Sequence, residues 1–139
     1  MRICKRQNEG LGMAAMASRV LRRVSVGQLT ATSDHAANLA AASKLCEEAA
    51  KAGACMLCLP EAFSFIGSAA TETVAQAEPL SGPRVGEYRA LASKHGLWLS
   101  LGGFHEAGGP GNRVYNTHLV VDDSGATVAE RVAGVCATP

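Results

Sequence analysis

Apolar and polar positions in the first half of the chain change from a strand-like pattern to a helical one and back again. Residues 24–32 (VSVGQLTAT) mix Val, Leu and Thr with one Gly, and residues 54–60 (ACMLCLP) are continuously apolar, as in strands buried on both faces. Between them, a helix is predicted from a cap at Ser33 or Asp34 to Gly53. The order strand, helix, strand predicts a right-handed parallel crossover. One side of the helical wheel collects Leu39, Ala42, Leu45, Cys46 and Ala49.

The second half of the chain repeats the alternation and ends in a hairpin pattern. Pro83 suits the first turn of a helix and Gly96 suits its end, with apolar residues spaced along one face between them. Residues 97–104 (LWLSLGGF) are predicted to form a third strand. The segments 114–122 and 127–132 flank the turn sequence DSGA, which is typical of a β-hairpin. The pattern therefore predicts a single α/β domain.

Composition supports a globular domain and excludes several classes of protein. Of 139 residues, 47% are hydrophobic and 18% are charged, and no window approaches the roughly 20 apolar residues of a membrane-spanning helix. Residues 1–26 carry six basic side chains against one acidic side chain, whereas the rest carries seven basic and eleven acidic side chains. An acidic body with few aromatic residues gives no support for binding to nucleic acid. We expect neither nucleic acid nor a membrane as a partner.

The basic N-terminus, residues 1–23, has the composition of a leader segment. The stretch MAAMASRVLRRVSV contains no acid and clusters its arginines, as organellar transit peptides do, and no long apolar segment of a secretory signal is present. We therefore expect a mitochondrial or cytoplasmic location, or both. A disordered, solvated leader without a targeting role is the alternative.

Cysteine and histidine residues give no pattern typical of a metal site. Five cysteines and no secretory signal favour reduced thiols. Cys55 and Cys58 have C-x-x-C spacing, but they lie in the predicted strand and would point to opposite faces, so we interpret them as buried core thiols. The four histidines lack metal-ligand spacing and are interpreted as surface or helix-end residues. They are His35, His95, His105 and His118.

Glu61 directly follows the apolar strand at residues 54–60. In open α/β sheets, working residues lie just past the carboxyl ends of strands. A carboxylate in that place is partly desolvated and suits the role of a general base. The alternative is that Glu61 only caps the next turn. Tyr115 and Asn116 begin a strand near the expected pocket mouth, but packing and a turn hydrogen bond explain them equally well.

Several segments, in this order and spacing, carry a specific resemblance to a known family. They read QLTATSDHAANLAAASKLCEEAAKAGACMLCLPEAF, PLSGP, GLWLSLGGFHE and VYNTHLVVDDSGATVAE, within residues 25–130. Together they resemble the nitrilase-like carbon–nitrogen hydrolases. The resemblance implies that residues 24–130 are the N-terminal portion of a four-layer αββα nitrilase-type sandwich. It also implies homo-oligomers, a small-molecule amide substrate such as an ω-amide acid, and no cofactor or metal.

The same resemblance implies a Glu, Lys, Cys triad, of which this chain matches one member. Glu61, in LPEAF, matches the general base, while Lys stabilises the oxyanion and Cys forms a thioester. After Glu130 the chain departs from the family pattern, and residues 131–139 form a divergent tail. The lysine role is not carried to Arg131, and Cys136 lacks the flanking pattern of the family's nucleophile.

Two functional hypotheses follow from this partial match. In the first, the chain represents part of an amidase, truncated before the Lys and Cys and inactive alone. In the second, it is a non-catalytic short isoform that binds full-length subunits and modulates them.

Overall fold

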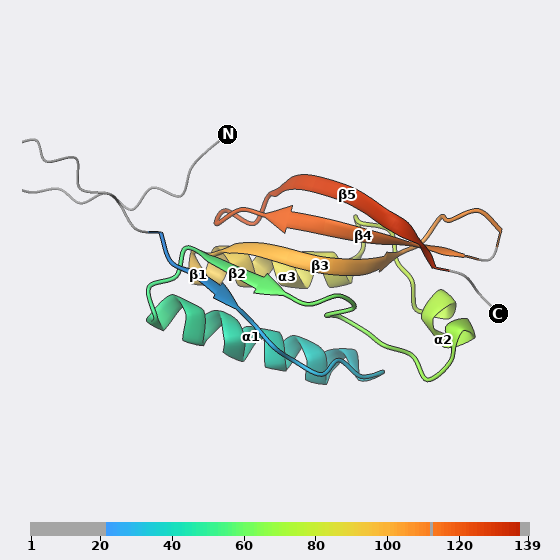
Figure 1. Cartoon of the computed structure of the whole chain (residues 1–139), viewed down its shortest axis with the longest axis horizontal. Coiled ribbons are helices and arrows are strands. Elements are labelled where there is room, and N and C mark those ends of the chain that lie inside the picture. The colour runs from blue at the N-terminus through green and yellow to red at the C-terminus, as the bar shows by residue number, and fades with distance from the viewer. Residues whose placement is uncertain (1–21, 112, 137–139) are drawn as a thin grey trace, which may run out of the picture.

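The computed structural model describes residues 22–111 and 113–136, which form a single sheet with helices packed against it (Figure 1). Most of the basic leader lies outside the described residues. Among those described, no helix has the length and apolarity needed to cross a bilayer. The elements are β1 (Val24–Val26), α1 (His35–Lys51), β2 (Met56–Leu59), α2 (Ala70–Ala75), α3 (Pro83–His95), β3 (Trp98–Glu106), β4 (Val114–Val121) and β5 (Thr127–Cys136).

The five strands lie in the sheet in the same order as in the sequence. β1, β2 and β3 are parallel, so the predicted parallel connections are confirmed. β3, β4 and β5 are antiparallel, which confirms the predicted hairpin. β1 is shorter than the strand predicted at residues 24–32, and the short helix α2 was not predicted. The parallel arrangement points the carboxyl ends of β2 and β3 toward the same end of the sheet, and the end of β3 lies close to α2 (Figure 1).

Local capping signals set the ends of the two long helices. The Asp34 side chain accepts a hydrogen bond of 3.0 Å from the backbone N–H of Ala37, as expected of an N-cap. Pro83 begins α3, and Gly96 ends it in the left-handed region at φ +61°. These helix predictions are confirmed. They depend only on residues within one turn of each helix end, so the local sequence was sufficient to make them.

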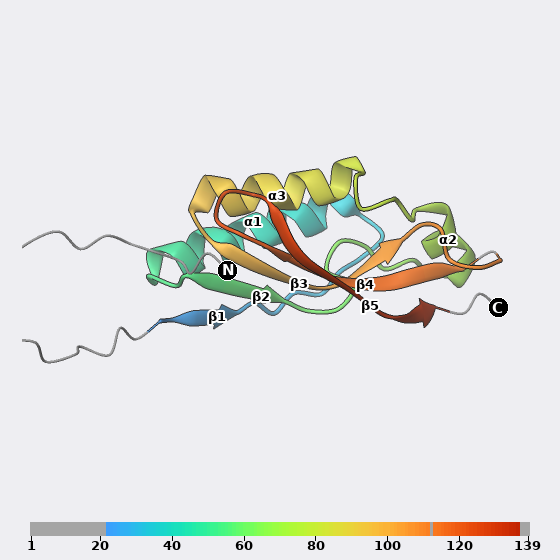
Figure 2. The ribbon, with the colours of Figure 1, turned by 90° about the horizontal axis from the view of Figure 1, so that it is seen from above.

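The hydrophobic core lies between the two long helices and one face of the sheet (Figure 2). Residues from α1 and α3 contact alternate residues of β2, β3 and β4, as the pleat of a strand requires. Asn38 is a buried polar residue of α1 that the apolar pattern did not predict. Large side chains with less than 2% exposure include Leu57, Phe63, Tyr88, Leu99, Leu101, Phe104 and Leu119.

Neither of the two long helices, α1 and α3, covers the opposite face of the sheet (Figure 2). We call this side the open face; it carries Met56 and Cys58 of β2, which are only half-buried. The prediction that residues 54–60 are buried on both faces is therefore wrong for this chain. The prediction that Cys55 and Cys58 are buried thiols is also wrong, because both are partly exposed.

Candidate functional site

Glu61 lies immediately after the carboxyl end of β2 and is held by a side chain from β4. Its Oε1 accepts a hydrogen bond of 2.6 Å from Nδ2 of Asn116, which is 55 residues away in the sequence. Asn116 therefore contacts the predicted base across the sheet. The expected desolvation of Glu61 is not found, because the residue is exposed on the open face, where the described residues supply no second layer.

The turn that carries Glu61 has an unusual backbone and is anchored by buried packing. Ala62 has φ +53°, a left-handed conformation that residues other than glycine rarely adopt. Its N–H donates a hydrogen bond of 3.0 Å to the carbonyl of Gly103. The next residue, Phe63, is fully buried and meets Tyr88 edge to face, with ring centroids 4.6 Å apart. Buried aromatic packing and a β3 hydrogen bond thus hold the strained turn in place.

The buried side chain of Asn38 ties the far end of the same loop to helix α1. Its Nδ2 donates to the carbonyls of Thr32 (2.8 Å) and Ser64 (2.9 Å), and its Oδ1 accepts from the N–H of Thr32 at 2.9 Å. The ring of His35 contacts the same Ser64 carbonyl and Oε2 of Glu87. Helices α1 and α3 therefore both fix the loop that follows β2.

Gly103 allows Glu61 and Asn116 to approach each other. A Cβ atom at this position would lie 2.5 Å from Oδ1 of Asn116 and 3.0 Å from Cγ of Glu61. The ladder between β3 and β4 shifts register between Leu101 and Phe104, which marks a β-bulge at this point. Gly102 and Gly103, adjacent in the predicted strand, are the feature of the sequence that could have indicated this bulge.

We predict that Gly103→Ala separates Glu61 from Asn116 and lowers the thermal unfolding midpoint of the longest protein product that contains residues 24–130. The added methyl group would overlap Asn116, and overpacking of this kind costs about 1–3 kcal/mol. Gly86→Ala is the matched control, because its Cβ would have no neighbour within 4 Å and it lies inside α3. That control should raise the midpoint, since alanine favours a helix over glycine by about 1 kcal/mol. Equal midpoints for the two variants would contradict the close approach at Gly103.

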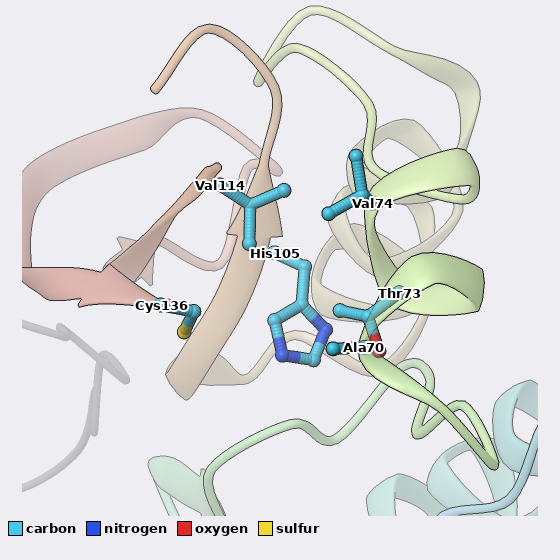
Figure 3. Close-up of a pocket in the computed structure, with 6 residues that line it drawn as sticks. All are labelled: Ala70, Thr73, Val74, His105, Val114 and Cys136. Carbon is cyan, nitrogen blue, oxygen red and sulfur yellow. The ribbon is translucent and has the colours of Figure 1, made fainter. Parts of the chain in front are cut away.

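His105 lies near the carboxyl end of β3 and lines a cavity there (Figure 3). It is paired with Asn116 in the ladder, so the two side chains share the open face. Its Nδ1 is buried and has no hydrogen-bond partner among the described residues. Burial lowers the pKa of His105, and the Glu61 carboxylate offsets part of that effect. His105 is half-buried, because residues of α2 lie across the cavity from it.

The described cysteines show no nucleophile beside Glu61. Burial raises the pKa of Cys46 to about 11, which makes this thiol unreactive at neutral pH. Cys136 lies at the end of β5 and lines the same cavity as His105 (Figure 3). Within the part of the chain that the structure describes, no cluster of three or more His, Cys, Asp or Glu side chains could hold a metal ion.

The profile of the family described as "Carbon-nitrogen hydrolase" matches residues 23–132. The chain belongs to the carbon–nitrogen hydrolase family. Deaminated glutathione amidase from Mus musculus is 42% identical over 120 residues, which cover 84% of this chain and 37% of the relative. The Homo sapiens protein of that name is 46% identical over 109 residues, covering 76% of this chain and 33% of the relative.

Solved structures of the same superfamily share the fold. The NitFhit protein of C. elegans matches with a TM-score of 0.70 and 36% identity, over 78% of this chain and 27% of that chain. A mutant amidase from Nesterenkonia sp. AN1 in complex with butyramide matches with a TM-score of 0.69 and 25% identity, over 80% and 42% of the two chains. The nitrilase-type fold expected from the sequence is thereby confirmed. The chain spans about a third of the length of the curated relatives named above.

Proposed function

We propose that this chain is part of an amidase that hydrolyses a small ω-amide acid such as deaminated glutathione. The two relatives above carry that substrate in their names. In the chemistry implied by the family, a cysteine thiolate attacks the amide carbon, the amine half of the substrate leaves after protonation, and water then cleaves the thioester to release the acid. A lysine stabilises the oxyanion, and a glutamate accepts and returns the protons.

The observation that carries this proposal is the position of Glu61. The carboxylate stands at the carboxyl end of a parallel strand, on a turn fixed by buried packing, and the Asn116 amide holds one of its oxygens at 2.6 Å. A carboxylate oriented by one hydrogen bond still has a second oxygen with which to accept a proton. Glu61 is therefore suited to act as the general base, and Asn116 is suited to position it.

The test is a mass-spectrometric assay for cysteinylglycine, the amine that hydrolysis of the γ-amide of deaminated glutathione frees, on the longest protein product that contains residues 24–130. We expect turnover of deaminated glutathione and no turnover of cysteinylglycine, which lacks that amide bond. A Glu61→Gln variant provides the site-specific comparison, and its expected effect is argued in the Discussion. Absence of cysteinylglycine release by a folded, full-length product would refute the proposal.

A second candidate function rests on the open face of the sheet. If a chain of this length occurs in cells, that face suits it to bind a full-length subunit and alter its activity. Copurification of the tagged 139-residue chain with the full-length product, together with a changed rate of hydrolysis of deaminated glutathione, would support this role. Copurification without any change in rate would exclude modulation.

A further inference from the structure

The loop that carries Glu61 is held on the helical side of the sheet by a histidine between two helices. Helices α1 and α3 lie side by side on that face (Figure 2). His35 is the first residue of α1, and its Nε2 lies 2.6 Å from Oε2 of Glu87 on α3. Its Nδ1 lies 3.2 Å from the carbonyl oxygen of Ser64 in the loop. We call His35, Glu87 and Ser64 together the His35 clamp.

Both partners of the His35 ring can only accept hydrogen bonds. A carboxylate and a backbone carbonyl have no proton to donate, whereas a neutral imidazole has one N–H and an imidazolium has two. A neutral ring would therefore turn a lone pair toward either Glu87 or Ser64. The side chain of His35 is 23% exposed, which limits the access of water as a replacement partner. The clamp is therefore complete only when His35 is protonated.

The other histidines of the described chain have no such requirement. Nε2 of His118 lies 3.0 Å from Oγ of Ser100, and a hydroxyl can either donate or accept, so a neutral ring satisfies this contact. His95 and His105 each have one buried ring nitrogen without a partner among the described residues, so protonation there would gain no hydrogen bond. Among the described histidines, His35 is the one whose contacts select the charged form.

The charged groups on the elements around the ring point to Glu87 as the group that favours this charge. Asp34 caps the start of α1, and Arg84 of α3 is paired with Glu78 at 3.2 Å. Glu61 lies toward the other end of the loop. The N-terminus of α1 disfavours a positive charge on the ring. The bond to Glu87 therefore depends on its carboxylate charge.

We infer that the His35 clamp holds the loop that carries Glu61 in a protonation-dependent way. The clamp is complete at acidic pH and loosens as the pH rises through the range in which histidine loses its charge. Asn38 donates to the same Ser64 carbonyl at 2.9 Å and does not titrate, so the clamp adjusts how often the loop opens and does not decide whether it folds. His35 is a positioning residue, because it acts on Glu61 through the loop backbone. Its importance for catalysis rests on the proposed function.

The first test measures opening of the loop by hydrogen exchange and mass spectrometry, in the longest protein product that contains residues 24–130. The N–H groups of Ala62, Phe65 and Ile66 are hydrogen-bonded to backbone carbonyls, so their exchange reports this opening. After correction for intrinsic amide exchange, opening should rise roughly three- to tenfold between about pH 5 and about pH 8, the effect of one hydrogen bond. The turn at residues 122–126 should not share this rise. Equal opening of the loop at both pH values would overturn the inference.

The second test removes the need for a charged ring. In Glu87→Gln, the side-chain amide can donate to Nε2, so a neutral ring can still donate from Nδ1 to Ser64. We expect this variant to lose the pH response and to open less than the parent at about pH 8. His35→Gln is uncharged at both pH values and should also show no response. Glu47→Gln is the matched control, because it removes an exposed carboxylate that pairs with Lys51 on α1, and it should keep the parental response. A parental response in Glu87→Gln would overturn the inference.

Failure of this inference is distinguishable from failure of the proposed function, because the exchange measurement needs no turnover. A pH response that Glu87→Gln abolishes, in a product that does not hydrolyse deaminated glutathione, would support the clamp and refute the amidase proposal. Hydrolysis by a product whose loop opens equally at both pH values would do the reverse.

Discussion

Glu61→Gln is expected to lower kcat/KM of the full-length product toward deaminated glutathione by about 10⁴-fold, because members of a catalytic triad act as a unit. Glutamine keeps the size of the side chain and can still pair with Asn116 after its amide rotates. The substitution therefore removes the proton acceptor while leaving the turn and its packing in place. The measurement is release of cysteinylglycine from deaminated glutathione under kcat/KM conditions, with circular dichroism to confirm that the variant is folded.

Cys136→Ala is the control for this prediction. Cys136 lines the neighbouring cavity but has no family pattern around it, so in a full-length product that retains residues 131–139 its loss should leave turnover within a few-fold. The 139-residue chain by itself should show no turnover, because it matches only the glutamate of the implied triad. Turnover by that chain that falls with Cys136→Ala would mean that Cys136 is a nucleophile and that our interpretation of residues 131–139 is wrong.

The features predicted correctly from the sequence depend on neighbours within a few residues. Asp34, Pro83 and Gly96 act on their own helix ends, and their caps appear where the pattern placed them. The hairpin around Gly125 follows from a turn sequence in the same way, with φ +84° at the glycine. Local chemistry was sufficient for the order and type of these elements.

Features of the site that the sequence did not predict depend on contacts between distant segments. Asn116 contacts Glu61 only because the register between β3 and β4 brings it there. That register shifts at a β-bulge, and the pattern of apolar residues along either strand does not give the size of the shift. His105 becomes partly buried because α2, which carries no strong helical pattern, packs near the end of β3. Burial of Asn38 likewise needs the Ser64 carbonyl, 26 residues away. Sequence resemblance singled out Glu61 as the proposed base, and the tertiary structure shows which residues hold it.

The 139-residue chain in isolation is expected to self-associate and to melt without a sharp transition. Edge strand β1 exposes Val24 by 54% and Val26 by 84%, and nearly every residue of the opposite edge strand β5 is exposed. Covering about 500 Å² of apolar surface would contribute roughly 12 kcal/mol at about 25 cal/mol per Å². That matches the whole stability of a typical domain, about 5–15 kcal/mol. Size-exclusion chromatography with light scattering should therefore show species larger than a monomer.

Val26→Lys tests whether the exposed edge and open face cause this association. A lysine on an edge strand blocks pairing with other chains, and Val26 is exposed enough to accept it without disturbing the core. Ile66→Lys is the matched control, because Ile66 is 46% exposed but lies in a loop outside the sheet. We expect Val26→Lys to shift the population toward monomer and Ile66→Lys to leave it unchanged. A monomeric parent chain with a cooperative melt would instead show that one covered face is enough for this half of the fold to be stable, and it would remove the reason to expect a partner on the open face.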